Sequence, residues 1–157
     1  MRIVTLLLLA LTVTGCATPY QNMGFMGGVE AQQMTTDTYR IVARGNGYTG
    51  GTTIQDYTLL KAAETTKQAG GTHFAIISAS DASRAGTIVT PGQAQTSVVG
   101  NTAFTTYSPA MAYNYVKPGQ DTYIRVFTIP RNQRPPQGVL SADEIIQFVG
   151  SRVKRPT

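Results

Sequence analysis

"YRIVARGNGYTGGTTIQDYTLLKAAETTKQAGGTHFAIISAS", from Tyr39 to Ser80, contains three successive elements that decide the fold class. In residues 39–44, apolar and polar side chains alternate with a period of two, which is typical of a half-exposed strand. Residues 54–69 have the pattern of a helix that ends at two glycines. Residues 72–80 are apolar on both faces, which favours an inner strand. The sequence therefore predicts a strand-helix-strand unit.

The predicted helix has its own start signal. Thr53 lies three residues before Asp56, a spacing that resembles a capping box, so we expect Thr53 to cap the helix. Glu64 and Lys67 have i,i+3 spacing and are expected to pair. The apolar side chains expected in the core are Tyr57, Leu59, Leu60, Ala62 and Ala63.

Two further elements follow near the C-terminus. A third strand is expected at Thr122–Ile129, ending before Pro130, which has no N–H to donate to a ladder. A second helix should begin at Ser141, which forms an S-x-x-E capping box with Glu144. Its apolar stripe is one-sided, so we expect it to pack on the sheet. The fold class expected for residues 37–157 is a single α+β domain of β-α-β-insertion-β-α order, with two helices packed on one small sheet.

The insertion, residues 85–120, is unusual in composition. Its first 32 residues, 85–116, carry no charge and alternate β-prone runs with turn residues. It is expected to form either an irregular hairpin extension or a disordered surface for partners. Without charges it has little protection against edge-to-edge pairing, so self-association is an alternative function. The candidate partner-contact residues, set against plain loop packing, are Tyr48, Tyr107, Tyr113 and Tyr115.

The N-terminus has the features of an export signal. A positive start is followed by an apolar run that is too short to span a membrane, so residues 1–15 are expected to be a signal peptide. Val13-Thr14-Gly15-Cys16 resembles the lipobox of bacterial lipoproteins. That resemblance implies cleavage before Cys16 and acylation of Cys16, and two or more acyl chains hold a protein durably in a membrane. An ordinary secretory signal, with Cys16 incidental, is the alternative.

The residues after Cys16 bear on the location of the domain. Ala17 stands where an aspartate would favour retention at the inner membrane, so the resemblance implies the outer membrane. We expect the domain to face the periplasm, and exposure at the cell surface is the alternative. Residues 16–36 are rich in Gly, Gln, Met and Thr and are expected to form a flexible tether with a root-mean-square span of about 25 Å. In the alternative, Phe25 and its neighbouring methionines dock back on the domain or on lipid.

The charge balance excludes one class of partner. Removal of residues 1–15 leaves 12 basic and 8 acidic side chains, a net charge of +4. An exported chain with no basic stripe interleaved with aromatics is not expected to bind nucleic acid. The basic C-terminal end, with Arg152, Lys154 and Arg155, is expected to be a solvated tail, and contact with anionic lipid headgroups is the alternative.

Gly45, Gly47 and Gly50 match the G-x-G-x-x-G fingerprint of dinucleotide-binding proteins. A nucleotide-using enzyme that binds NAD or ATP is therefore a second alternative. Against it, the expected cap at Thr53 lies past the last glycine, whereas in the fingerprint the helix opens within the glycines. Asp81 also follows Gly50 by 31 residues rather than the roughly 20 that the motif needs. We expect a mobile loop that exposes Tyr48.

Other catalytic or metal-binding constellations are missing from the sequence. His73 is the one histidine and is expected to be a packed or hydrogen-bonded strand residue. No cysteine or histidine cluster indicates a zinc site, and no G-x-S-x-G indicates a serine nucleophile. Asp81 and Asp121 border strands and approach each other only if the fold joins those ends. No catalytic residue, cofactor or metal is predicted.

Four stretches, "YRIVARGNGYT", "DYTLLKAAETTKQAGGTHFAII", "YIRVFTI" and "SADEIIQFV", resemble a family of small proteobacterial envelope lipoproteins of unknown function. The shared features are the lipobox, a strand ending in Gly45-Asn46, an L-x-[RK]-A-A-E-x-T helix that includes Leu60 to Glu64 and Thr66, and Phe74 in the next strand. The middle departs, since it lacks the tryptophan of those proteins. The resemblance implies an envelope location and an α+β fold. The expected function is a non-catalytic binding or scaffolding domain for an unknown envelope protein, and the alternative is a self-assembling or surface-adhesive lipoprotein.

Overall fold

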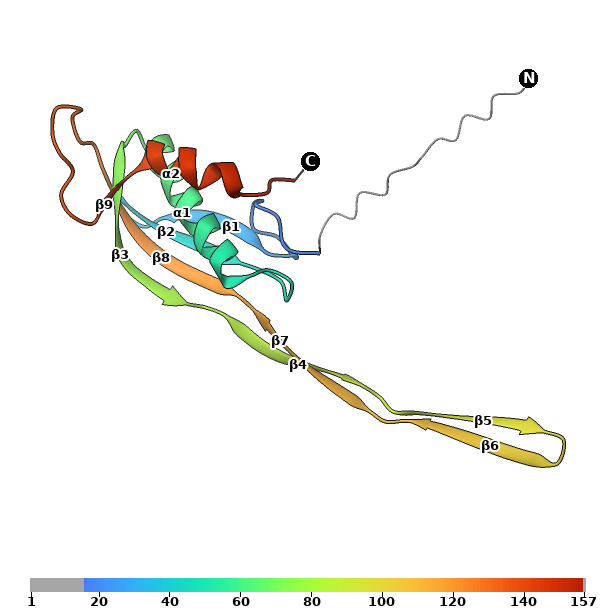
Figure 1. The fold of residues 1–157 in the computed structure, drawn as a ribbon. Coiled ribbons are helices and arrows are strands. Elements are labelled where there is room, and N and C mark those ends of the chain that lie inside the picture. Colours follow the sequence, from blue (N-terminus) through green and yellow to red (C-terminus); the bar gives the residue numbers. More distant parts are fainter. Residues whose placement is uncertain (1–15, 157) are drawn as a thin grey trace, which may run out of the picture.

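A computed structural model describes residues 16–156. The fold is α+β, as predicted, with one five-stranded sheet, two α-helices and a long two-stranded ribbon that projects from the sheet (Figure 1). The predicted signal peptide, residues 1–15, lies outside the described residues. The strands are β1 (Gly28–Gln33), β2 (Thr38–Arg44), β3 (His73–Asp81), β4 (Arg84–Thr90), β5 (Gln93–Val99), β6 (Thr102–Ser108), β7 (Met111–Lys117), β8 (Gly119–Phe127) and β9 (Val139–Ser141). The helices are α1 (Gly51–Gln68), α2 (Ala142–Phe148) and the 3-10 turn η1 (Gly150–Arg152).

The sheet has the strand order β1-β2-β8-β3-β9, and every neighbouring pair is antiparallel. The predicted strand-helix-strand unit, β2-α1-β3, is therefore split. β2 and β3 run in the same direction, but β8 lies between them. Since β8 is the strand that returns from the ribbon, the ribbon leaves the sheet at its centre, between β3 and β8.

Helix α1 lies on one face of the sheet, in contact with β1, β2, β3 and β8. Four of the five side chains expected in the core are buried, and Leu59 is half-buried. Helix α2 packs against α1 and beside β9, and Ser141 caps it as predicted by accepting the Glu144 N–H at 3.4 Å. The buried apolar core consists of Tyr20, Val29, Ile41, Ala43, Ile54, Tyr57, Leu60, Ala62, Ala63, Phe74, Ile124, Ala142 and Val149.

Two predictions about α1 are wrong. The helix begins at Gly51 with Gly50 as its N-cap, and no side chain caps it, so Thr53 is already inside the helix. The cause is a tight turn just upstream, where the Thr49 N–H donates to the Asn46 carbonyl and turns the chain directly into the helix. Glu64 and Lys67 do not pair with each other, because the C-terminal part of the chain offers each of them another partner. Arg155 lies 2.8 Å from Glu64, and Asp143 lies 2.8 Å from Lys67.

The prediction of an inner strand holds for the first part of β3 alone. Short β9 pairs with residues His73–Ala75, and a register shift follows between Ile76 and Ser78. Beyond that point β3 has β8 on one side and an open edge on the other. Ile76 and Ile77 are exposed there.

The flexible tether predicted for residues 16–36 is also wrong. Residues 28–33 form β1, which pairs with the whole of β2, and Val29 is buried in the core. The glycines that suggested flexibility instead permit a tight turn. Gly27 and Gly28 have positive φ angles of 94° and 137°, and a Cβ on Gly28 would lie 2.5 Å from the Asn22 carbonyl oxygen. The packed domain therefore begins close to Cys16.

Candidate functional sites: the ribbon and the Cys16 end

The insertion forms a hairpin extension that is divided into two ladders, which agrees with the first of the two structures expected for it. β4 pairs with β7 from Arg84↔Lys117 to Thr90↔Met111, and β5 pairs with β6 as far as Val99↔Thr102. A break at Pro91 and Gly92 separates the two halves. Each side of the hairpin has sixteen residues, 84–99 and 102–117. At about 3.3 Å per residue, the ribbon reaches about 50 Å from the sheet.

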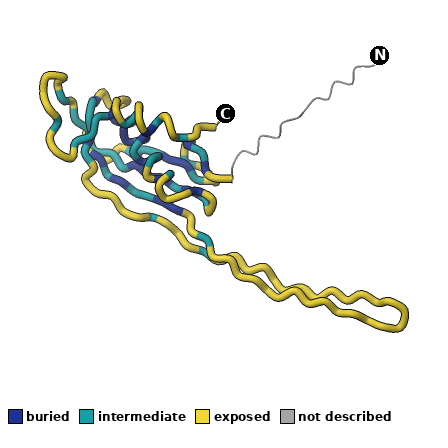
Figure 2. Tube along the Cα trace, in the orientation of Figure 1, coloured by how far each residue is buried: buried dark blue, intermediate teal, exposed yellow. Residues whose placement is uncertain are grey.

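Nearly every residue of the ribbon is exposed on both faces (Figure 2). A two-stranded hairpin without a packed face is marginally stable at best in water. The ribbon carries no charge over residues 85–116, and its backbone N–H and C=O groups are open along both edges. The ribbon therefore has an extended surface of apolar and polar side chains that the rest of residues 16–156 does not bury.

The predicted contact tyrosines fall into two groups. Tyr107 and Tyr113 are exposed on the ribbon. Tyr48 is exposed on the loop of residues 45–50 between β2 and α1, which we call the glycine loop. Tyr115 differs, because its ring lies over Gly86, where an added Cβ would come within 2.6 Å of it. The Lys117 ammonium lies 5.4 Å from the centre of the same ring. Tyr115 therefore helps to fix the base of the ribbon.

Thr18 is the centre of a second cluster, which the sequence did not reveal. Its N–H donates to the Thr49 hydroxyl at 2.9 Å, and its own hydroxyl donates to the Met26 carbonyl at 2.8 Å. The Thr18 hydroxyl also accepts the Asn46 N–H at 3.0 Å, and its carbonyl accepts the Tyr57 hydroxyl at 2.8 Å. Four segments of the chain are thereby joined through one buried residue.

Cys16 itself is exposed, but its backbone is held. The side-chain amide of Asn46 donates to the Cys16 carbonyl at 2.6 Å. The carbonyl oxygen of the same Asn46 side chain accepts from the Tyr48 N–H and the Thr49 hydroxyl. The glycine loop therefore holds the segment that begins at Cys16.

Tyr20 connects this segment to helix α1 and to the C-terminal tail. Its ring packs edge-on against Tyr57 at 5.4 Å between centroids, and its hydroxyl donates to Glu64 at 2.5 Å. Its N–H donates to the Lys154 carbonyl at 2.9 Å, and the Arg155 guanidinium lies over its ring at 5.1 Å. Burial, followed by the hydrogen bond to Glu64, raises the pKa of the Tyr20 hydroxyl far above its ordinary value.

The expectation of a free C-terminal tail is wrong for its two arginines. Arg152 forms two hydrogen bonds to Asp56, at 2.6 and 2.7 Å, and Arg155 binds Glu64. These pairs fasten η1 and the tail to α1. Because both arginines are exposed, each ion pair contributes little to the stability of the fold. Together the two pairs fix the position of the tail.

Helix α1 begins directly after Gly50, as the helix of a dinucleotide fingerprint does, and the cap expected at Thr53 is absent. Several loop amides, however, already donate within the chain and are not free for a phosphate. The N–H groups of Gly45, Asn46 and Tyr48 bind the Pro118 carbonyl, the Thr18 hydroxyl and the Asn46 side chain, respectively. β8 also separates β2 from β3, whereas the fingerprint needs adjacent parallel strands.

The remaining candidate side chains have structural partners. The fold does bring Asp81 and Asp121 near each other on paired strands, but Asp121 binds Arg44 at 2.6 Å. Asp81 accepts the Ser83 N–H at 2.8 Å, and hydrogen bonds from Ser83 lower the pKa of Asp81. His73 Nδ1 lies 2.8 Å from the Thr72 hydroxyl, which confirms a hydrogen-bonded strand histidine. Within residues 16–156, no three acidic, histidine or cysteine side chains are grouped as a metal site would require.

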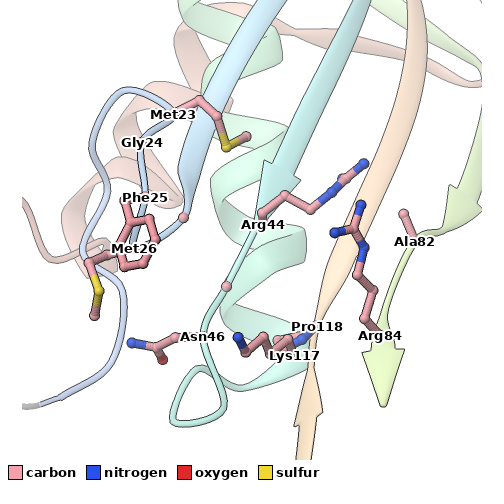
Figure 3. Close-up of a pocket in the computed structure, with 12 residues that line it drawn as sticks. Met23, Gly24, Phe25, Met26, Arg44, Asn46, Ala82, Arg84, Lys117 and Pro118 are labelled. Carbon is pink, nitrogen blue, oxygen red and sulfur yellow. The ribbon is translucent and has the colours of Figure 1, made fainter. Parts of the chain in front are cut away.

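A pocket lies between the turn at Gly24 and the base of the ribbon (Figure 3), and one of its lining residues, Asn46, binds the Cys16 carbonyl. The pocket is open and has a volume of about 380 Å³. Phe25 and Met26 border it on one side, and Arg84 and Lys117 border it on the other.

Comparisons with family models, with curated proteins and with solved structures give no match to this chain. The resemblance to envelope lipoproteins therefore stays a prediction. Across residues 16–156, none of the helices has both the length and the apolar character needed to cross a bilayer.

Proposed function

We propose that the chain is a non-catalytic lipoprotein of the bacterial envelope, anchored in the outer membrane through acylated Cys16 and facing the periplasm. In this proposal the β4–β7 ribbon is an arm that binds a second envelope protein. The lipobox-like sequence before Cys16 supports the anchor. The resemblance of residues 37–81 to envelope lipoproteins supports the compartment.

One observation carries the binding role. The ribbon projects about 50 Å, carries no charge over residues 85–116, and is exposed on both faces. A hairpin of this kind lacks a packed face of its own, so burial against a partner would supply the missing stabilisation. A partner strand can add to either open edge through backbone hydrogen bonds, and exposed Tyr107 and Tyr113 provide contact area with few torsions to order.

The register of the ribbon allows a precise deletion. Thr90 and Met111 lie opposite each other, so residues 91–110 can be replaced by Asn-Gly, which favours a two-residue hairpin turn. Partners are then crosslinked in intact envelopes and purified with the wild type and with this shortened variant. We expect a partner that the wild type retains and the shortened variant loses. Identical partner sets would remove the ribbon from the proposal.

Self-assembly is a second candidate, favoured by the two open edges of the ribbon, which carry no charge over residues 85–116. Sedimentation of the Cys16→Ser chain over a range of concentrations tests it. Association that disappears in the shortened variant would support self-pairing of ribbons. A strict monomer at every concentration would exclude it and leave a different protein as the partner.

The anchor has its own test. Labelling cells with radioactive palmitate should mark the wild type and leave Cys16→Ala unlabelled. Equal labelling of the two proteins would show that Cys16 is not the acylation site.

A further inference from the structure

The end of the domain that holds Cys16 is also the end from which the ribbon leaves. The side-chain amide of Asn46 binds the Cys16 carbonyl, and Asn46 lines the same pocket as Lys117 at the end of β7 (Figure 3). Thr18, two residues after Cys16, binds the Met26 carbonyl on the opposite wall. We call the exposed surface of Cys16, Phe25, Met26, Arg84 and Lys117 the anchor face.

A rigid turn presents the apolar part of the anchor face. Phe25 is fully exposed and Met26 is mostly exposed. The turn is closed by two backbone hydrogen bonds between Gly24 and Gly27, at 3.0 and 3.2 Å, in addition to the bond from Thr18. The turn holds the Phe25 side chain out in the solvent, where it contributes nothing to the stability of the fold. The same arrangement suits insertion into an apolar or interfacial environment.

The charged part of the anchor face is basic. Arg84 and Lys117 stand directly opposite each other in the first pair of the ribbon, and both are exposed. Neither forms an ion pair within residues 16–156, whereas the third basic residue of the pocket, Arg44, is neutralised by Asp121. None of the described residues that line the pocket is acidic. The face therefore complements an anionic surface.

We propose that the anchor face contacts an anionic phospholipid bilayer. Phe25 and Met26 enter the interfacial layer, and Arg84 and Lys117 bind headgroup phosphates. This inference rests on the proposed anchoring at Cys16, because acyl chains on that residue would hold the adjoining surface against the bilayer. It also fixes where the ribbon begins, since an arm that begins at the anchor face starts at the membrane surface. The partner is then a protein within reach of the arm from that surface.

A lipid-quenching experiment tests the contact in the full chain. Phe25→Cys is labelled with an environment-sensitive fluorophore and reconstituted into phosphatidylglycerol-containing vesicles that also carry a nitroxide lipid. Gln133→Cys is the control, because Gln133 is exposed in the loop after β8, at the end of that strand away from Gly119 (Figure 1). We expect quenching at position 25 to exceed that at position 133 several-fold. Equal quenching at the two positions would overturn the proposal.

A second experiment separates this contact from the anchor. The full chain carrying Cys16→Ser is tested for binding to phosphatidylglycerol vesicles at low salt, with and without Arg84→Gln and Lys117→Gln. Loss of two basic side chains at the surface should weaken binding about 30-fold. The pair Arg131→Gln and Arg134→Gln removes the same charge from the distant loop and should have a much smaller effect.

Equal losses for the two double variants, or no binding to vesicles by the parent chain, would contradict the anchor face. The proposed function is judged separately, by the mass of the wild-type chain and by palmitate labelling. A chain that lacks acyl mass but binds vesicles through Arg84 and Lys117 would refute the lipid anchor and preserve the contact.

Discussion

Thr18 and Asn46 illustrate how much of this site depends on single polar side chains. Thr18 is buried, and its hydrogen bonds connect the segment after Cys16 to the glycine loop and to α1. Asn46 connects the Cys16 carbonyl to the same loop. The sequence predicted neither role, because a threonine and an asparagine in polar, glycine-rich stretches carry no periodic signal. The partners that join the segment after Cys16 to the glycine loop and to α1 lie 28 to 39 residues away in the chain.

Asn46→Ala tests this connection. The substitution removes three side-chain hydrogen bonds, so we expect the free energy of unfolding to fall by about 1–2 kcal/mol. Hydrogen exchange should also accelerate at the amide of Thr18, whose bond to Thr49 relies on the same loop. Asn132→Ala, in the exposed loop after β8, is the control and should change stability by less than about 0.5 kcal/mol. Equal effects of the two substitutions would mean that Asn46 does not hold the segment after Cys16 on the glycine loop.

Tyr20 gives the protein a predictable response to alkaline pH. Its pKa is raised from 10.0 by folding, so the neutral hydroxyl is favoured in the folded state and the stability it contributes is complete below about pH 10. Above that pH the unfolded chain ionises first, and this contribution declines by up to about 1.4 kcal/mol per pH unit. Urea unfolding between pH 8 and 11 should show a shallower decline for Tyr20→Phe than for the wild type. Parallel curves would place Tyr20 outside the core.

At the scale of elements, the sequence predicted those with a strong period and missed those that depend on distant pairing. α1, α2, β2 and β8 follow from amphipathic patterns that bury Ile41, Leu60 and Ile124. β1 was missed because Gly27 and Gly28 look like flexible residues, and it forms because β2 offers a free edge. The ribbon was expected as one of two alternatives, since its β-prone runs fit either a hairpin or a loop. The glycine motif occurs both in nucleotide-binding loops and in this loop, which holds the Cys16 backbone. The motif alone does not distinguish the two roles.

Val29→Ala tests β1 as a part of the core. Val29 is 1% exposed, so the loss of two methyl groups should cost about 2 kcal/mol of unfolding free energy. Val98→Ala is the matched control, because Val98 is 70% exposed on the ribbon, and it should cost almost nothing. Denaturant unfolding measures both. If Val29→Ala were as mild as Val98→Ala, residues 16–36 would behave as the tether that the sequence alone suggests.

The whole molecule combines a packed end that holds Cys16 with a projecting ribbon. Residues 16–33 pack on the domain, and the ribbon starts at the same end with Arg84 and Lys117 (Figures 1 and 2). Acylation of Cys16 would then hold the base of the arm at the bilayer surface. The reach of the arm would set the distance over which it meets its partner.

Site-specific photocrosslinking in living cells tests this account most directly. A photoreactive amino acid replaces Tyr107 on the ribbon or, as the control, Gln133 in the distant loop. We predict an adduct of one defined mass from position 107, no such adduct from position 133, and loss of the adduct when Cys16→Ala removes the anchor. No adduct from position 107, or the same adduct from both positions, would contradict the binding-arm proposal.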